Sequence, residues 1–125
     1  MLENLLYQKL TEKIRQAAFD VHNYFRNGFL EKVYENAIAY KLNKLAINCQ
    51  QQVPLKVYFE DDVVVGEYFA DLLVENKVII ELKAMENLEK IHFAQVKHYL
   101  KTTKLRLGLL INFGKPILEF KRIIL

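Results

Sequence analysis

The chain contains few of the residues that cross-link or interrupt a protein. It has one cysteine, two prolines, four glycines and no tryptophan among 125 residues. A single cysteine, Cys49, excludes an internal disulfide framework and is typical of a reducing cytoplasm. No cysteine or histidine stands at metal-ligand spacing from Cys49, so we expect this side chain to pack in the core, with a reactive thiol as the alternative.

Long apolar runs are also missing. None is long enough to cross a bilayer, and Met1-Leu2-Glu3-Asn4 lacks the basic and then apolar layout of a signal peptide. Internal repeats, low-complexity tracts and Pro/Gly/Ser-rich linkers are absent as well. Because 52% of the residues are hydrophobic and 26% are charged, the chain can bury a core. We therefore expect a single cytoplasmic domain over residues 1–125, with no membrane partner.

The net charge of +3 is too small to indicate a nucleic-acid-binding protein, but its distribution is uneven. From Lys97 to Leu125, seven lysines and arginines stand against one acid, Glu119, so this stretch carries +6 and the rest of the chain −3. A basic C-terminal third could meet phosphates. The alternative is a solvated lysine face that keeps the protein soluble.

The spacing of apolar residues predicts eight elements. The expected helices span residues 5–24, 30–45 and 88–102, and the expected strands span residues 51–60, 63–74, 77–83, 107–113 and 117–123. Asn87 is the expected N-cap of the third helix. Pro54 argues either that residues 51–60 form an edge strand or that Pro54 lies where the strand begins. The strand at 107–113 is almost entirely apolar, so both of its faces should be buried. This order predicts an α/β fold in which helices flank a central mixed β-sheet.

The same periodicity predicts which side chains of the first two helices face the core. In the first helix the stripe includes Ile14, Val21 and Tyr24. In the second it comprises Val33, Ala37, Ile38 and Leu42.

Three charged residues lie among the strand-forming apolar residues. These are Asp71, Glu81 and Lys83, and buried strands rarely carry charges unless these have partners or a metal. Glu81 and Lys83 are two residues apart and therefore share a face. A three-residue loop at 75–77 would place Asp71 opposite Glu81, whereas a two-residue loop would place it opposite Ile80. We predict the three-residue loop, or a β-bulge near Asp71, because only then do the carboxylates converge.

An Asp, a Glu and a Lys at one place can hydrolyse a phosphodiester. Two carboxylates together with a substrate phosphate suit Mg²⁺, for which Mn²⁺ can substitute, because Mg²⁺ prefers hard oxygen ligands and retains several waters. The ion would lower the pKa of a bound water, and Lys83 would position that water or neutralise developing charge. The alternative is a surface hairpin with an ordinary ladder of Glu and Lys.

Other polar side chains accompany these elements. Glu31 opens the second helix, where the helix dipole alone would favour a carboxylate. Gln95 and Tyr99 lie one turn apart on the third helix, and His92 shares their face. A lone histidine there is more often a surface or core residue than a general base.

Gly28-x-x-Glu31-x-x-Tyr34 resembles the signature of the GxxExxY proteins, which belong to the PD-(D/E)XK nuclease superfamily and have the restriction-endonuclease-like fold. The similarity covers the chain from about Ala18 onward. The matching segments are Val21-His22, Gly28 to Tyr34, Gln52-Val53-Pro54-Leu55, Ala70 to Val74, Glu81-Leu82-Lys83-Ala84, Gln95-x-x-x-Tyr99-Leu100 and Asn112-Phe113-Gly114. Ala70 stands where the superfamily's name has proline, and no site residue is missing.

The resemblance implies a role for each candidate residue. Asp71 and Glu81 would bind the metal, Glu31 would complete the metal site directly or through water, and Lys83 would be the catalytic amine. Gln95 would orient Lys83 or contact a phosphate. The expected nucleic-acid contacts are Tyr99, Lys97 and Lys101.

Three functional hypotheses follow. The first is a Mg²⁺-dependent nuclease acting on DNA, with a homodimer as a way to place two active sites across a duplex. The second is a catalytically silent module on the same fold that binds nucleic acid or protein. The third is an enzyme that hydrolyses some other phosphate ester.

Overall fold

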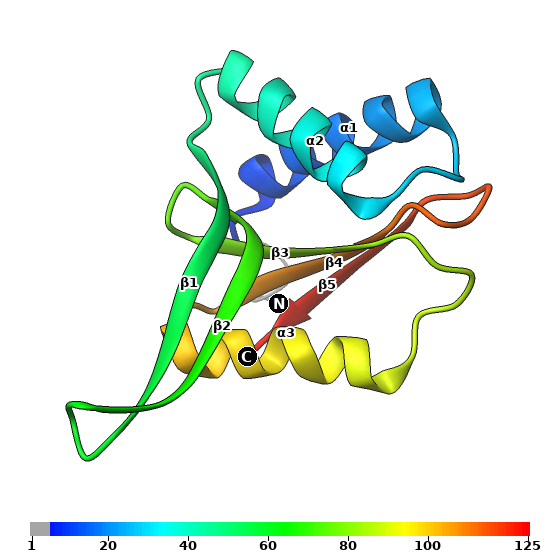
Figure 1. The fold of residues 1–125 in the computed structure, drawn as a ribbon. Coiled ribbons are helices and arrows are strands. Elements are labelled where there is room, and N and C mark those ends of the chain that lie inside the picture. The colour runs from blue at the N-terminus through cyan, green and yellow to red at the C-terminus, as the bar shows by residue number, and fades with distance from the viewer. Residues whose placement is uncertain (1–5) are drawn as a thin grey trace.

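The computed structural model describes residues 6–125. Two predictions concern residues outside this range. They are the start of the first helix at Leu5 and the lack of a signal-peptide layout in Met1-Leu2-Glu3-Asn4. The described part holds three helices and five strands in the predicted order (Figure 1). They are α1 (Gln8–Phe25), α2 (Glu31–Lys44), β1 (Cys49–Phe59), β2 (Val63–Val74), β3 (Val78–Lys83), α3 (Lys90–Thr103), β4 (Leu107–Asn112) and β5 (Glu119–Ile124).

The strands form one sheet in the order β1-β2-β3-β4-β5. β3 and β4 run parallel, with α3 as the crossover between them, and every other neighbouring pair is antiparallel. Figure 1 shows α1 and α2 on one face of the sheet and α3 on the other. The predicted α/β fold with a mixed sheet flanked by helices is therefore confirmed.

The core lies on both faces of the two central strands. Alternate residues of β3 and β4, such as Leu82 and Ile111, join the cluster under α1 and α2. Ile79 and Leu110 point the other way and pack with Val96 of α3. All of β4 is buried, as its sequence predicted, and the prediction that β1 is an edge strand is also confirmed.

The two N-terminal helices differ in part from the expected burial. Ile14 and Val21 are buried, but Tyr24 is 82% exposed, so its assignment to the inner stripe was wrong. In α2 the buried face is rotated toward Tyr34 and Glu35, and Val33 and Ala37 are only partly buried. The cause is Tyr34, whose ring stacks on Phe113 at 4.5 Å between centroids and turns that side of the helix inward.

The start of the third helix also differs from the prediction. α3 begins at Lys90, and its N-cap is Glu89 rather than Asn87. Glu89 and His92 form a capping box, in which the Glu89 N–H donates to His92 Nδ1 at 2.9 Å. Reciprocal capping satisfies two backbone donors and fixes the helix start two residues later than apolar spacing alone indicated.

No helix within residues 6–125 combines the length and the apolar character that a membrane crossing requires.

Candidate active site

The β2–β3 hairpin sets the position of the candidate carboxylates. Val74 pairs with Val78 and Leu72 with Ile80, which confirms the predicted three-residue loop at 75–77. The next pair in this register is Asp71 and Glu81, which come from adjacent strands and face each other. The spacing of the loop thus produces the convergence that the metal hypothesis requires.

At this pair, side-chain carboxylates accept hydrogen bonds from the backbone N–H groups of β2 and β3. The Asp71 N–H donates to Glu81 Oε1 at 3.0 Å, and the Leu82 N–H donates to Asp71 Oδ2 at 2.9 Å. Each acid is thereby fixed by the backbone of the opposite strand. Charge-assisted bonds of this kind hold a carboxylate oxygen in a defined direction.

Glu81 is almost completely buried, with 3% of its surface exposed. Burial raises the pKa of Glu81 to about 8, and the negative charge of Asp71 adds to this effect. A carboxylate in this setting is costly to ionise unless a cation lies beside it. Divalent metal ions are the usual partners of such acidic pairs in proteins.

Lys83 is the last residue of β3 and lies two residues beyond Glu81 on the same face of the strand. It is partly exposed, and its charge acts to lower the pKa values of both Glu81 and Glu31. The ammonium group therefore lies within electrostatic reach of the acids at the open end of the sheet.

Glu31 is the first residue of α2, as the sequence predicted. Burial raises its pKa; the charges of Asp71 and Glu35 also raise it, whereas those of Lys83 and His92 lower it. Glu31 is exposed at the start of α2 and lies within electrostatic range of Asp71 and Lys83. Over the described range 6–125, however, no three His, Cys, Asp or Glu side chains lie close enough together to form a metal-ligand cluster.

Two further residues, Gln52 and Glu35, connect the helix layer to the carboxylates. Gln52 Nε2 donates to Glu35 Oε1 at 2.8 Å and to Asp71 Oδ1 at 3.2 Å. Glu35 is 3% exposed, and its other oxygen accepts bonds from Lys32 at 3.0 Å and Gln51 at 2.8 Å. Neither Gln52 nor Glu35 had a predicted role, although Gln52 lies in one of the segments that carry the resemblance described above.

Gln52 also has an unusual backbone. Its φ is 51°, in the left-handed region, although it lies within β1 opposite Asp71. A non-glycine residue in this conformation is uncommon in a strand and is strained. From this strained backbone position the Gln52 side-chain amide bonds to both Glu35 and Asp71.

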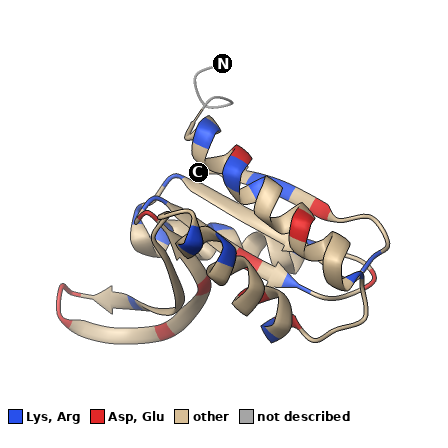
Figure 2. Cartoon of the chain, turned by 90° about the horizontal axis from the view of Figure 1, so that it is seen from above, with Lys and Arg blue, Asp and Glu red and all other residues tan. Residues whose placement is uncertain are grey.

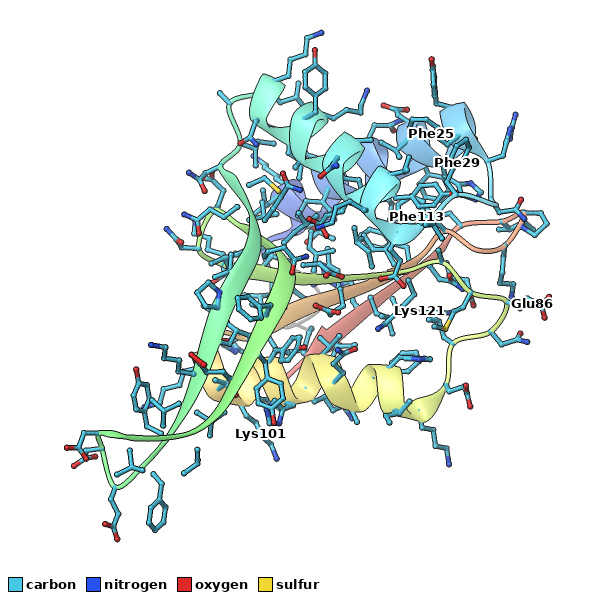
Figure 3. All side chains as sticks on the ribbon, viewed as in Figure 1. Phe25, Phe29, Glu86, Lys101, Phe113 and Lys121 are labelled. Atoms are coloured by element: carbon cyan, nitrogen blue, oxygen red, sulfur yellow. The ribbon has the colours of Figure 1, made fainter. Side chains whose placement is uncertain are left out.

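The segment from Gly28 to Tyr34 presents Glu31. Gly28 has φ 118°, which favours glycine. The Tyr34 hydroxyl donates to the Arg26 carbonyl at 2.6 Å and accepts from the Phe29 N–H at 3.1 Å. Figure 3 shows Phe25, Phe29 and Phe113 gathered at this end of the helix layer. Tyr34 therefore has a structural role, because it closes the loop that leads into α2.

Gln95 and Tyr99 approach the site from α3. Gln95 Nε2 donates to the Tyr99 hydroxyl at 3.1 Å. Burial raises the pKa of Tyr99, the hydrogen bond from Gln95 lowers it, and the charges of Glu81 and Asp71 raise it further. Of the residues on this face, His92 is used in the helix cap.

Lys97 and Lys101 are exposed on α3. At about 100° per residue, Lys97 lies roughly 160° around the helix from Gln95, on a different side. The structure therefore does not bring Lys97 to the carboxylates, and Figure 3 shows Lys101 below α3, away from the helix layer of α1 and α2.

Asn112 fixes the chain that follows Lys83. Its side chain accepts from the Met85 N–H at 3.1 Å and donates to the Met85 carbonyl at 2.9 Å. A Cβ atom at Gly114 would overlap the Met85 backbone, so glycine is required where these two loops meet. Asn112 and Gly114 thus support the end of β3 on which Lys83 lies.

The donor set fits a divalent cation. Asp71 and Glu81 offer hard oxygens at one place, and Mg²⁺ is commonly held by one or two carboxylates together with waters and substrate oxygens. A ligand set of two carboxylates that leaves positions open is typical of a catalytic rather than a structural ion.

A family model described as the PD-(D/E)XK nuclease superfamily matches residues 8–123. A search of curated proteins and a search of solved structures each found no match.

Proposed function

The chain belongs to the PD-(D/E)XK nuclease superfamily, which implies a nucleic-acid substrate, and we propose that it is a metal-dependent nuclease that hydrolyses phosphodiester bonds in DNA. One observation carries the proposal: Asp71 and Glu81 face each other across β2 and β3, each fixed by the opposite backbone. We further propose that the chain is a member of the GxxExxY group, on the evidence of Gly28, Glu31 and Tyr34.

The proposed chemistry divides among four residues. Asp71 and Glu81 would hold Mg²⁺ or Mn²⁺, and Glu31 would complete the metal site directly or through water. When bound, the ion supplies an acidified water and stabilises charge on the phosphate. Lys83 supplies a positive charge on the open side, where it orients the attacking water or stabilises the phosphorane-like transition state.

Residues of α3 complete the proposed site. Gln95 orients the Tyr99 hydroxyl, which contacts a phosphate oxygen of the substrate. Lys97 and Lys101 attract the nucleic acid at longer range from the outer side of the helix. We also propose a single cytoplasmic domain that acts as a homodimer, because two copies would place two sites across a duplex.

The test of the function is Lys83→Ala. We expect this variant to bind Mn²⁺ as the wild type does and to lose cleavage of plasmid and single-stranded DNA, because Lys83 acts on the reaction and not on the ion. Glu81→Ala should lose both properties. Lys90→Ala, which removes an exposed lysine at the start of α3, is the matched control. Normal cleavage by Lys83→Ala would contradict the catalytic role proposed for Lys83.

A second candidate is a silent module that binds nucleic acid or protein on the same fold. The modest net charge of +3 and the exposed apolar hairpin of β1 and β2 favour it. It predicts that DNA binding without cleavage survives in Asp71→Ala, whereas the nuclease proposal predicts that Asp71→Ala abolishes turnover.

A further inference from the structure

The β1–β2 hairpin continues beyond the body of the protein as an arm formed by residues 56–67 (Figure 1). The base of the arm is anchored to the rest of the protein. Leu55 is buried, and the ring centroids of Tyr68 and His98 on α3 are 4.7 Å apart. Further out the side chains are apolar but exposed. Those at least half exposed are Tyr58, Phe59, Val63 and Val65. Neighbouring exposed apolar side chains on one projection favour an interaction surface.

The tip of the arm is acidic. Glu60, Asp61 and Asp62 follow one another in the turn, and Figure 2 shows the acidic colour at the far end of the hairpin. Glu60 and Asp61 share a hollow with Lys56, Lys101 and Lys104. Asp62 does not line that hollow, and three adjacent carboxylates disfavour a phosphate at the outermost end of the arm. Its partner should instead carry apolar surface with positive charge.

Addition of a strand along β1 is disfavoured. Pro54 lies in the middle of this edge strand and has no N–H to donate, and Gln52 departs from strand geometry. The sides and tip of the arm, rather than its edge, are therefore the surface that a partner would contact.

The same chain carries a surface of the complementary kind. Two adjoining hollows of about 540 and 640 Å³ share Asp20, Tyr40 and Lys41 and form one groove between the outer sides of α1 and α2. Most of the lining is apolar, and the floor includes Ala17 and Leu45. The basic side chains along the groove are Lys13, Lys41 and Lys44.

We propose that the arm of one copy docks in the α1–α2 groove of a second copy. Tyr58 and Phe59 would cover the apolar lining, and the three acids of the tip would meet the lysines of the groove. Asp20 is the one acid in the groove, and it lies 3.5 Å from Lys41, so the groove stays basic. The inference gives a surface to the homodimer proposed above, and it requires neither metal nor nucleic acid.

The test is a charge exchange followed by sedimentation velocity, without metal or DNA. Asp61→Lys/Asp62→Lys in the arm and Lys41→Glu/Lys44→Glu in the groove should each convert the wild-type dimer to monomer. A chain with all four substitutions should associate again, because the charges are exchanged and remain complementary. Glu12→Lys/Glu86→Lys and Lys90→Glu/Lys121→Glu make the same charge changes at exposed positions elsewhere and should leave association unchanged.

The outcomes are distinct. A monomeric wild type at sub-millimolar concentration would overturn the proposal and would leave the arm for a different, basic partner. A dimer that persists in both double variants would also overturn it, because another surface would then hold the copies together. DNA cleavage is measured separately on the same samples, so failure of the docking surface and failure of the nuclease proposal give different results.

Discussion

Glu81 is the residue whose environment has the clearest energetic consequence. Its pKa is about 8 in the folded protein against 4.5 for an unburied glutamate. Between these values the folded state holds more protons than the unfolded state, so stability falls as pH rises. The loss is roughly 1.4 kcal/mol per pH unit in that window.

We therefore expect Glu81→Gln to be more stable than the wild type in the metal-free protein above pH 5. The amide resembles the protonated acid, and its carbonyl oxygen can still accept the Asp71 N–H. The difference in Tm, measured in a chelator at pH 6 and pH 9, should be larger at pH 9. An equal difference at both values would contradict the assignment of the raised pKa to Glu81.

Gln52 is the residue that ties Asp71 to Glu35. Removing the amide in Gln52→Ala should weaken Mn²⁺ binding about 10-fold or more, as is typical when a partner of a metal ligand is lost. Titration with Mn²⁺ measures this effect. Gln51→Ala is the control, because Gln51 also donates to Glu35 but makes no recorded bond to Asp71. Equal losses in both variants would assign the effect to Glu35 rather than to the bridge.

The sequence predicted some of these residues and not others. Asp71, Glu81 and Lys83 stand out because charges in apolar strands need partners, and the loop at 75–77 fixed their register. Gln52 gave no such signal, because an uncharged glutamine in an edge strand is common and local sequence does not predict a left-handed φ at a residue other than glycine. Its role depends on a buried Glu35 that belongs to another element.

At the scale of elements, the loop before α2 determines where Glu31 lies. Tyr34 closes this loop by bonds to Arg26 and Phe29, and it also turns the helix so that Val33 and Ala37 line the outer groove. Apolar spacing alone predicted the burial of Ile38 and Leu42 correctly, but it placed Val33 and Ala37 on the inner face and missed Tyr34. It could not weigh one large ring stacked on Phe113 against several smaller side chains.

Tyr34→Phe keeps the ring and removes the hydroxyl. We expect a loss of about 1–3 kcal/mol, because the Arg26 carbonyl and the Phe29 N–H lose their partner. Urea unfolding measures the change, and Tyr40→Phe on the exposed side of α2 is the control. We also expect slower cleavage, since Glu31 follows the loop directly. Unchanged stability would show that water replaces the hydroxyl and that stacking alone closes the loop.

At the scale of the whole molecule, the order of elements and the mixed sheet could be predicted because periodicity and turn residues are local. The projection of the arm could not be predicted. The pairing of β1 with β2 depends on neighbouring residues of the hairpin and is the same whether or not the rest of the protein packs beneath it. The basic residues of the C-terminal third lie on α3, on β5 and in the loops on either side of β4, so charge counted along the sequence does not define a single face.

The central claim is that Asp71 and Glu81 form the metal site of a nuclease, and its most direct test is calorimetric titration with Mg²⁺ and Mn²⁺. The wild type is compared with Asp71→Ala/Glu81→Ala, and Glu12→Ala/Glu86→Ala removes two exposed acids as the control. DNA cleavage is assayed on the same samples. The account predicts metal binding and cleavage in the wild type and the control, and neither in the site variant. No metal binding by the wild type, or equal binding by the site variant, would contradict it.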